Sequence, residues 1–302
     1  MSNAKASRLT QVGIYLGKHW RLFLNECGWK VLIFGAVISA LVSAVLGQNM
    51  FVYTGETFRG CFTLISACIW IGIFNSIQSI CKERAIIQRE HYAGLHISSY
   101  VVSHLIFQAG ICLVQAGILL GISAAVLNYP AVQPLFGSVL LEYFVTYFLV
   151  TYAADVLGLA ISAIVRSPTT AMTVMPFVLI LQLLFSGMLF TLEGPMGIVG
   201  SATISKWGLN ATAISADYNN LPNTELVNAT VRMQTIVQEE GLPLTNEQVD
   251  ELMKEHYEVE INPDYDHKAG SLAANWGFLL VHTAVYAAVA IVALEFVDRD
   301  KR

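Results

Sequence analysis

Charged side chains are scarce in this sequence. Only 13% of its 302 residues are Asp, Glu, Lys or Arg, whereas soluble domains carry about 25%. Hydrophobic residues make up 55%, and the mean hydropathy is +0.57. This balance excludes a chain built mainly of soluble domains and predicts that most of it lies in lipid.

Motifs for catalysis and metal binding are also missing. The seven histidines are scattered without an HExxH pair, and no GxSxG nucleophile turn occurs. Gly13–His19 is one residue too short for a phosphate-binding loop and ends in His instead of Ser or Thr. None of the five cysteines has metal-ligand spacing, and none falls in residues 193–271, where no disulfide is therefore expected. We expect no enzyme activity and no cofactor bound by this chain itself.

Six apolar segments are long enough to cross a bilayer, which takes about 20 residues in a helix. Strands of membrane barrels need only about 10 residues, so each segment is predicted to be helical. The expected fold is an all-α membrane protein with six spans: Trp29–Leu46, Phe58–Ile80, Tyr100–Leu127, Phe136–Val165, Ala171–Leu192 and Leu272–Phe296. Residues 29–192 would hold the first five spans, and 272–302 the sixth span and a tail.

The basic residues predict which way the loops face, because Lys and Arg gather in cytoplasmic loops. Twelve of the 17 lie in residues 1–30, in 81–99, at Arg166 and in the tail after the sixth span. Both termini are therefore expected in the cytoplasm, in a multi-pass protein of the plasma membrane. The long segment 193–271, with four basic and 13 acidic residues, would lie outside.

Residues 193–271 are predicted to form a small external helical domain. Residues 193–213 are rich in Gly and apolar side chains, which suits a re-entrant segment that dips back towards the membrane. Thr224–Glu240 is predicted to be a helix that ends before a Gly and a Pro. Thr245–Gln248 has the pattern of a capping box and predicts a second helix that reaches about His256.

Residues 1–28 are expected to form a cytoplasmic arm with one amphipathic helix, Leu9–Glu26. Its apolar side chains recur at helical spacing, and Lys18 and Arg21 fall on the opposite face. Such a helix lies in the plane of the membrane interface, with Trp20 at headgroup depth. Packing against a partner subunit is a compatible alternative.

The segment Cys81–Tyr100 combines charge, helix-forming residues and a Gly between two spans. We expect a short amphipathic helix at about 82–95 with exposed charged side chains, namely Lys82, Glu83, Arg84, Arg89 and Glu90. Such a helix can dock in a groove of a soluble partner, where its charges would fix the register. A solvated basic loop between two spans is the alternative.

Polar residues inside spans are the usual pointers to function in a membrane protein. Asp155 lies deep in the fourth predicted span, where it would contact another helix or a water-filled cavity, or relay protons or cations. Gln182 and Asn75 are expected to hydrogen-bond between helices, and lining a pocket is the alternative for either. Gly117 and Gly121 form a small-residue pair that lets another helix approach closely.

Several short motifs follow one another in a characteristic order. Glu83 and Glu90 are seven residues apart, Gly94 follows, and Ser98-Ser99-Tyr100 opens the third span. Later come Val165-Arg166-Ser167, then Phe185-Ser186-Gly187, then Ser205-Lys206-Trp207-Gly208. With an amphipathic helix before the first span and a long segment before the sixth, this order resembles the ABCG-type permeases, which are type-2 ABC exporters. Each motif alone is weak, and their order over nearly the whole chain is the stronger signal.

The resemblance implies the permease subunit of an ATP-driven exporter. Two permeases, identical or different, would pair around a central pathway in membrane lipid, and no nucleic acid is involved. ATP and Mg²⁺ would bind an ABC ATPase subunit carried by another polypeptide or by a part of the gene outside this sequence. Animal members often have cysteines in the external segment, and this sequence departs from them there.

The resemblance also assigns residues. Those that would couple the permease to the ATPase are Glu83, Arg84, Arg89, Glu90 and Gly94. Those that would line the cargo path are Cys68, Ile71 and Asn75 on the second span and Leu179, Ile180 and Leu183 on the fifth. Met188, just past the Phe-Ser-Gly motif, would help to form an apolar gate to the outside.

The cargo and the wider function stay open at this stage. An apolar path suggests an amphipathic or lipid-like cargo, but the same fold class moves peptides, drugs and glycans. A proton-coupled secondary transporter that uses Asp155 is one alternative, although no internal repeat relates spans one to three to spans four to six. A membrane sensor with an acidic external domain is another.

Overall fold

The computed structural model describes residues 7–190, 194–240, 244–256 and 261–299, and all elements within them are helices. The first half holds α1 (Arg8–Asn25), α2 (Lys30–Leu46), α3 (Thr54–Ser76), α4 (Ser79–Tyr92), α5 (Ile97–Val126) and α6 (Val139–Ile164). The second half holds α7 (Pro168–Leu184), α8 (Pro195–Ser201), α9 (Ile204–Ser215), η1 (Tyr218–Asn220), α10 (Thr224–Glu239), α11 (Asn246–His256), η2 (Pro263–Tyr265) and α12 (Ala269–Arg299).

Among the described residues, four helical segments are long and apolar enough to cross a membrane: Thr54–Tyr92, Ile97–Val126, Val139–Ile164 and Ala269–Phe296. The pair α1 and α2, bent by 68° at a short break, adds a fifth if counted as one span. α2 and α7 match the first and fifth predicted spans and have 17 residues each. The all-helical membrane fold is therefore confirmed, with four or five spans by length and composition.

The fifth predicted span, Ala171–Leu192, forms a shorter helix than expected. The Ser167 hydroxyl caps its start by accepting a hydrogen bond from the Thr170 N–H at 3.2 Å. The helix ends at Leu184, and Gly187 follows with a φ of +87°, which favours Gly. The backbone therefore leaves the helix at the Phe-Ser-Gly motif, and residues 191–192 lie outside the described part.

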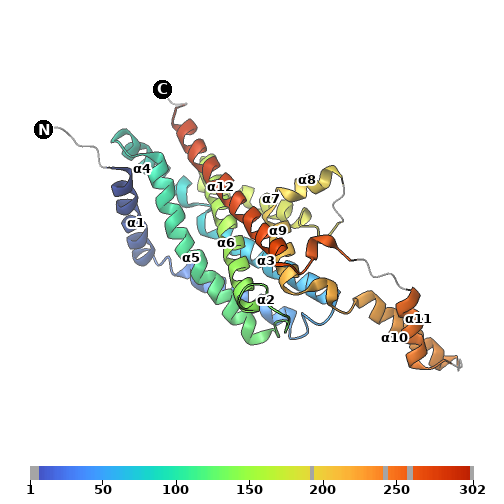
Figure 1. Ribbon diagram of the computed structural model, residues 1–302. Helices are drawn as coiled ribbons and strands as arrows, with labels where there is room; N and C mark the ends of the chain where they lie inside the picture. Colours follow the sequence, from blue (N-terminus) through green and yellow to red (C-terminus); the bar gives the residue numbers. More distant parts are fainter. Residues whose placement is uncertain (1–6, 191–193, 241–243, 257–260, 300–302) are drawn as a thin grey trace.

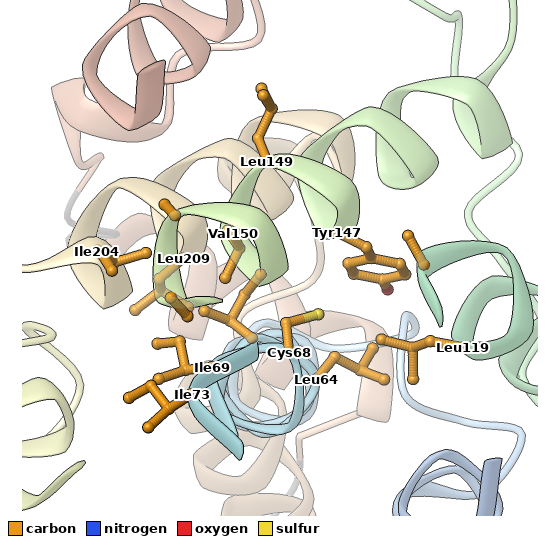
Figure 2. Close-up of a cluster of buried hydrophobic side chains, with 14 of the residues drawn as sticks. Leu64, Cys68, Ile69, Ile73, Leu119, Tyr147, Leu149, Val150, Ile204 and Leu209 are labelled. Carbon is orange, nitrogen blue, oxygen red and sulfur yellow. The ribbon is translucent and has the colours of Figure 1, made fainter. Parts of the chain in front are cut away.

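The core lies where α3, α6 and α9 meet. α3 packs most extensively against α6, and α6 packs against α12 on its other side. In Figure 2, Cys68 and Ile69 of α3 lie in one buried cluster with Val150 of α6 and Leu209 of α9. A Cβ atom on Gly72 would lie 2.2 Å from a backbone oxygen of α6, so the missing side chain permits this close crossing.

The predicted close approach at Gly117 and Gly121 is not found within the described chain. Both glycines are exposed on α5, and a Cβ atom at Gly121 would meet nothing within 4 Å. The close crossing uses Gly72 of α3 and Gly158 of α6 instead, because the side-chain oxygen of Ser76 and the backbone of α3 press directly on Gly158.

The segment between α7 and α12 has two parts. α9 is buried along most of its length between α3, α6 and α12. α10 and α11 pack against each other and protrude from the bundle (Figure 1). The capping box is confirmed, since the Thr245 N–H donates to Gln248 Oε1 at 3.0 Å and the Gln248 N–H donates to Thr245 Oγ1 at 3.3 Å.

The two ends of the bundle are distinct in Figure 1. The start of α1 and the end of α12 lie at the same end, close to α4. The α10–α11 hairpin lies at the opposite end. This arrangement places α1, α4 and both terminal helix ends on one side of the apolar helices.

Candidate functional site

The predicted docking helix is α4, and its first turn is fastened to the end of α6. The Ser162 hydroxyl oxygen of α6 accepts a hydrogen bond from the Ile80 N–H at 3.1 Å. The Arg84 guanidinium donates to the carbonyl oxygen of Ala163 at 2.9 Å and to that of Val165. Carbonyls at a helix C-terminus lack partners within the helix and attract cations. Arg84 therefore ties α4 to α6.

Two acidic side chains of α4 face α1. The Tyr15 hydroxyl donates to Glu90 Oε2 at 2.7 Å, and the Lys18 ammonium lies 3.1 Å from Glu83 Oε2. Burial and the adjoining Glu90 raise the pKa of Tyr15, so its hydroxyl remains a donor. Glu83, Arg84 and Glu90 are half-buried and bonded within the chain. The expectation that these three side chains are exposed is therefore wrong.

The turn between α4 and α5 is held by a single side chain of α1. Gln11 donates its amide N–H to the carbonyl oxygen of Gly94 at 3.2 Å. Its amide oxygen accepts from the His96 N–H at 2.9 Å. Gly94 has a φ of +107°, a conformation that side-chain-bearing residues rarely adopt. The Gly of the sequence motif is therefore required by this turn.

A row of buried polar groups continues from Glu83 into α5. The Tyr100 hydroxyl donates to Glu83 Oε2 at 3.3 Å, and His104 Nε2 lies 2.9 Å from the same hydroxyl. The rings of His104 and His19 have their centroids 3.9 Å apart. Burial lowers the pKa of His19 to about 4, so its ring is neutral near pH 7. The row joins α1, α4 and α5 through Glu83.

The outward face of α4 is formed by side chains that the bonding leaves free to meet a partner. Its exposed members are Lys82, Ala85, Ile86, Arg89, Tyr92 and Ala93. Ile86 is 41% and Tyr92 72% exposed. Two apolar groups thus flank Arg89 on this surface, which we call the α4 outer face. The sequence predicts the charged residues of the α4 outer face. Which apolar side chains it includes depends on how α4 is rotated about its axis.

The three predicted path residues of the second span lie on α3 in different surroundings. Cys68 and Ile71 are buried, and Cys68 belongs to the central cluster (Figure 2). Asn75 is half-buried, and its amide exchanges two hydrogen bonds with that of Gln115 on α5, at 2.7 and 3.0 Å. Asn75 therefore bonds between helices, as expected. Its partner Gln115 was not predicted, although a lone amide in an apolar span is a usable signal.

The predicted path residues of the fifth span also differ in how exposed their side chains are. Leu179 is buried against the central cluster, Leu183 is half-buried and Ile180 is 57% exposed. Gln182 points inward, where its amide oxygen accepts the Ile204 N–H at 3.0 Å at the start of α9. Met188 is half-buried and packs against the central cluster. Ile180 is thus the member of this set that the chain leaves most open to a neighbour.

Asp155 is fully buried in α6. Neither of its carboxylate oxygens has a hydrogen-bond partner within the described residues. Such a group is costly in a low-dielectric interior unless it is protonated or finds a partner. Within the same residues, no cluster of three or more His, Cys, Asp or Glu side chains could hold a metal ion.

The sequence of this chain matches one protein family over most of these elements. The family described as ABC-2 type transporter matches residues 16–195, which is more than half of the chain. The chain therefore belongs to the ABC-2 type transporter family, and the resemblance to ABC permeases is confirmed. The matched region includes α2 to α7 entirely, and with them α4 and its contacts to α6.

One protein similar to this chain is the ABC transporter ATP-binding/permease protein Rv1747 of Mycobacterium tuberculosis. It is 28% identical over 230 residues, which cover 71% of this chain and 26% of the relative. The chain thus spans about a quarter of the length of this relative, whose name joins an ATP-binding and a permease function.

Proposed function

We propose that this chain is the permease of an ATP-driven exporter in the plasma membrane and works with an ABC ATPase and a second permease. The observation that carries the proposal is the α4 outer face. It is exposed, combines Arg89 with the apolar Ile86 and Tyr92, and belongs to a helix bonded at one end to α6 and along its length to α1. A partner that moves α4 would therefore move the bundle core with it.

The direction of the chain in the membrane belongs to the same proposal. α2, α3, α5, α6, α7 and α12 would make six spans, with α1 lying at the interface. The distribution of the basic residues supports a cytoplasmic location for α4 and both termini and an external location for the acidic α10–α11 hairpin. The common end of α1, α4 and α12 in Figure 1 supports this topology.

The cargo path would run between α3 and α7 of two permeases. Ile180 and Leu183 on α7 and Asn75 on α3 would face it, because they are exposed or half-buried in the single chain. Cys68, Ile71 and Leu179 are buried and would shape the path from behind. α7 exposes Phe177, Ile180 and Leu181, an apolar surface that suits a second permease or an amphipathic cargo. Met188 would stand at the outer end as a gate.

The direct test is ATP hydrolysis that depends on this chain. Each ABC ATP-binding protein of the same genome would be co-expressed with the permease, and the membrane complex purified. One of them should co-purify, and its ATPase activity should change at least threefold when the permease is present in lipid. If no ATP-binding protein forms a complex and none changes its rate, the exporter proposal is wrong.

The buried Asp155 favours a second candidate function, a proton-coupled transporter. Its two unpartnered oxygens in the interior of α6 support a proton site. Asp155→Asn would then abolish transport driven by a pH gradient. In an ATP-driven exporter the same substitution would leave ATP hydrolysis largely intact, so this variant separates the two functions.

A further inference from the structure

A cavity of about 700 Å³ lies where α1 bends into α2 and α3 passes into α4. Helix α5 forms another wall, and Met172 of α7 also lines the cavity. Binding sites for small molecules in proteins occupy about 300–1,000 Å³. The cavity shares Asn75 with the proposed cargo path and Lys82 and Ile86 with the α4 outer face, and it lies at the end of the bundle that carries α4.

The lining of the cavity contains charged, uncharged polar and apolar side chains. The charged part comes from α1, the turn after it and α4, and consists of Lys18, Glu26, Lys82 and Glu83. Apolar side chains of the helices that run into the bundle include Val31, Phe74, Ile77, Phe107 and Ile111, and the uncharged polar side chains of Asn75, His104 and Gln108 lie among them. The charged side chains beside α1 and α4 suit the polar head of an amphiphile, and the apolar ones suit the first part of its acyl chain.

The charges of the rim balance one another. Lys18 and Glu83 pair with each other at 3.1 Å. Lys82 and Glu26 are exposed, and neither has an ion pair within the described residues. The rim therefore offers one ammonium and one carboxylate to a ligand. A phosphate would be attracted to Lys82 and an amine to Glu26, whereas a purely anionic headgroup would be repelled by Glu26.

The position of α1 indicates that the amphiphile comes from the bilayer. α1 exposes the apolar side chains Leu9, Trp20 and Leu24, which helical spacing places on one face. Tryptophan and apolar residues on an amphipathic helix lie at the depth of lipid headgroups. The cavity lies behind this helix, so its charged rim is at headgroup depth and its apolar wall is at the depth of acyl chains.

We propose that this cavity binds a zwitterionic phospholipid with a primary amine, of the phosphatidylethanolamine type. The phosphate lies near Lys82, the amine near Glu26, and the first part of an acyl chain lies between Val31, Phe74 and Ile111. The bound lipid fills the space between the interfacial helix α1 and the bundle. The inference goes beyond the proposed function, because it concerns one chain and needs no ATPase.

Native mass spectrometry of the purified full chain tests the proposal. The chain is equilibrated with mixed micelles that contain equal amounts of phosphatidylethanolamine, phosphatidylglycerol and phosphatidylcholine, and the retained lipid is counted. We expect about one phosphatidylethanolamine per chain. Val31→Trp, which fills the cavity, should reduce its retention at least tenfold. Ile33→Trp lies two residues further on the same helix, is exposed to lipid and should reduce it less than twofold.

A pair of charge variants tests the headgroup independently of any change in packing. Lys82→Glu should reduce the retention of phosphatidylethanolamine at least tenfold. Arg21→Glu lies on the exposed side of α1 and outside the cavity, and it should not reduce the retention. If Val31→Trp fails to fold, as judged by size-exclusion chromatography, this pair decides. Equal retention of phosphatidylglycerol by the wild-type chain, or full retention by Lys82→Glu, would overturn the proposal. Either result would leave the ATPase proposal untouched.

Discussion

The hydroxyl of Tyr15 on α1 donates a 2.7 Å hydrogen bond to Oε2 of Glu90, 75 residues further along the chain. Together with the contact of Lys18 and Glu83, it fixes α1 along one side of α4. The opposite side of α4 is the α4 outer face, which is exposed. The glutamates of the sequence motif therefore hold α4 against α1, and in the docking that we propose the exposed side chains between them would touch the ATPase.

Removal of the Tyr15 hydroxyl should loosen α1. Hydrogen bonds to charged groups contribute about 1.5–3 kcal/mol, so Tyr15→Phe should lower the free energy of unfolding by about that amount. Thermal unfolding of the detergent-solubilised chain measures it. Tyr92→Phe is the matched control, because Tyr92 is 72% exposed on α4 and should change stability by less than about 0.5 kcal/mol. Equal losses in both variants would argue against a special role of the Tyr15–Glu90 contact.

Charge reversal on the α4 outer face should separate docking from folding. Arg89→Glu is expected to weaken ATPase association at least tenfold without a change in thermal stability, because Arg89 is exposed. Glu90→Lys should reduce both ATPase association and thermal stability, because it also breaks the hydrogen bond from Tyr15. Co-purification and ATPase assays measure association. Arg232→Glu makes the same charge change on exposed α10, at the opposite end of the bundle, and should have no effect.

Acidic pH should weaken the contact of α1 with α5. The imidazole of His19 has a folded pKa of about 4, whereas an unfolded histidine titrates near 6.5. Between these values the unfolded state binds more protons, so stability falls as the pH falls from about 6.5 towards 4 and is unaffected by this group above pH 7. The groups facing His19 are Lys18 on α1, Glu83 on α4, and His104 and Tyr100 on α5.

Melting temperatures between pH 4 and pH 8 measure this dependence. His19→Gln should flatten the profile below pH 6.5, while His282→Gln, on α12 away from this row, should leave it as in the wild-type chain. A His19→Gln profile with an unchanged acid slope would show that His19 is not the group responsible.

The crossing of α3 and α6 should not tolerate a methyl group. A Cβ atom on Gly72 would lie 2.2 Å from the Thr151 carbonyl oxygen, so Gly72→Ala must push the helices apart. Overpacking of this kind costs about 1–3 kcal/mol or more. Gly110→Ala is the control, because a Cβ atom there meets nothing within 4 Å and should be neutral or slightly stabilising. Comparable melting temperatures for both variants would contradict the close crossing.

The topology makes a separate prediction. A cysteine introduced by Glu240→Cys, at the exposed end of α10, should react with a membrane-impermeant maleimide added outside intact cells. Arg89→Cys should react only after the membrane is opened. The opposite pattern would reverse the assignment of the two ends of the bundle.

Local sequence signals predicted the elements well, because they act over a few residues. The apolar runs located α3, α5, α6 and α12, and the Thr245 capping box located the start of α11. Each of these depends on propensity, length or capping chemistry that neighbouring residues supply. The end of α7 was missed, since the fifth span was expected to continue to Leu192, whereas the backbone leaves the helix at the Phe-Ser-Gly motif, where Gly187 has a positive φ.

Contacts between distant residues could not be predicted in the same way. The sequence shows the charges of Glu83 and Glu90, but their inward direction depends on Tyr15 and Lys18, which lie 65–75 residues away. The Gly117 and Gly121 pair has the pattern of a packing face and yet is exposed. The close crossing uses Gly72 and Ser76, which have the same four-residue spacing of small residues, and the spacing alone does not tell the two pairs apart. Helix rotation decides these cases, and it is set by the packing of the whole bundle.

Photo-crosslinking from position 89 tests most directly whether α4 docks on an ATPase. Arg89→p-benzoylphenylalanine would be placed on the α4 outer face in the complex with the co-purified ATP-binding protein, with Arg232→p-benzoylphenylalanine as control at the other end. We predict a crosslink to the ATP-binding protein from position 89 and none from position 232. A stable complex that crosslinks from position 232, or not at all from position 89, would contradict coupling through α4.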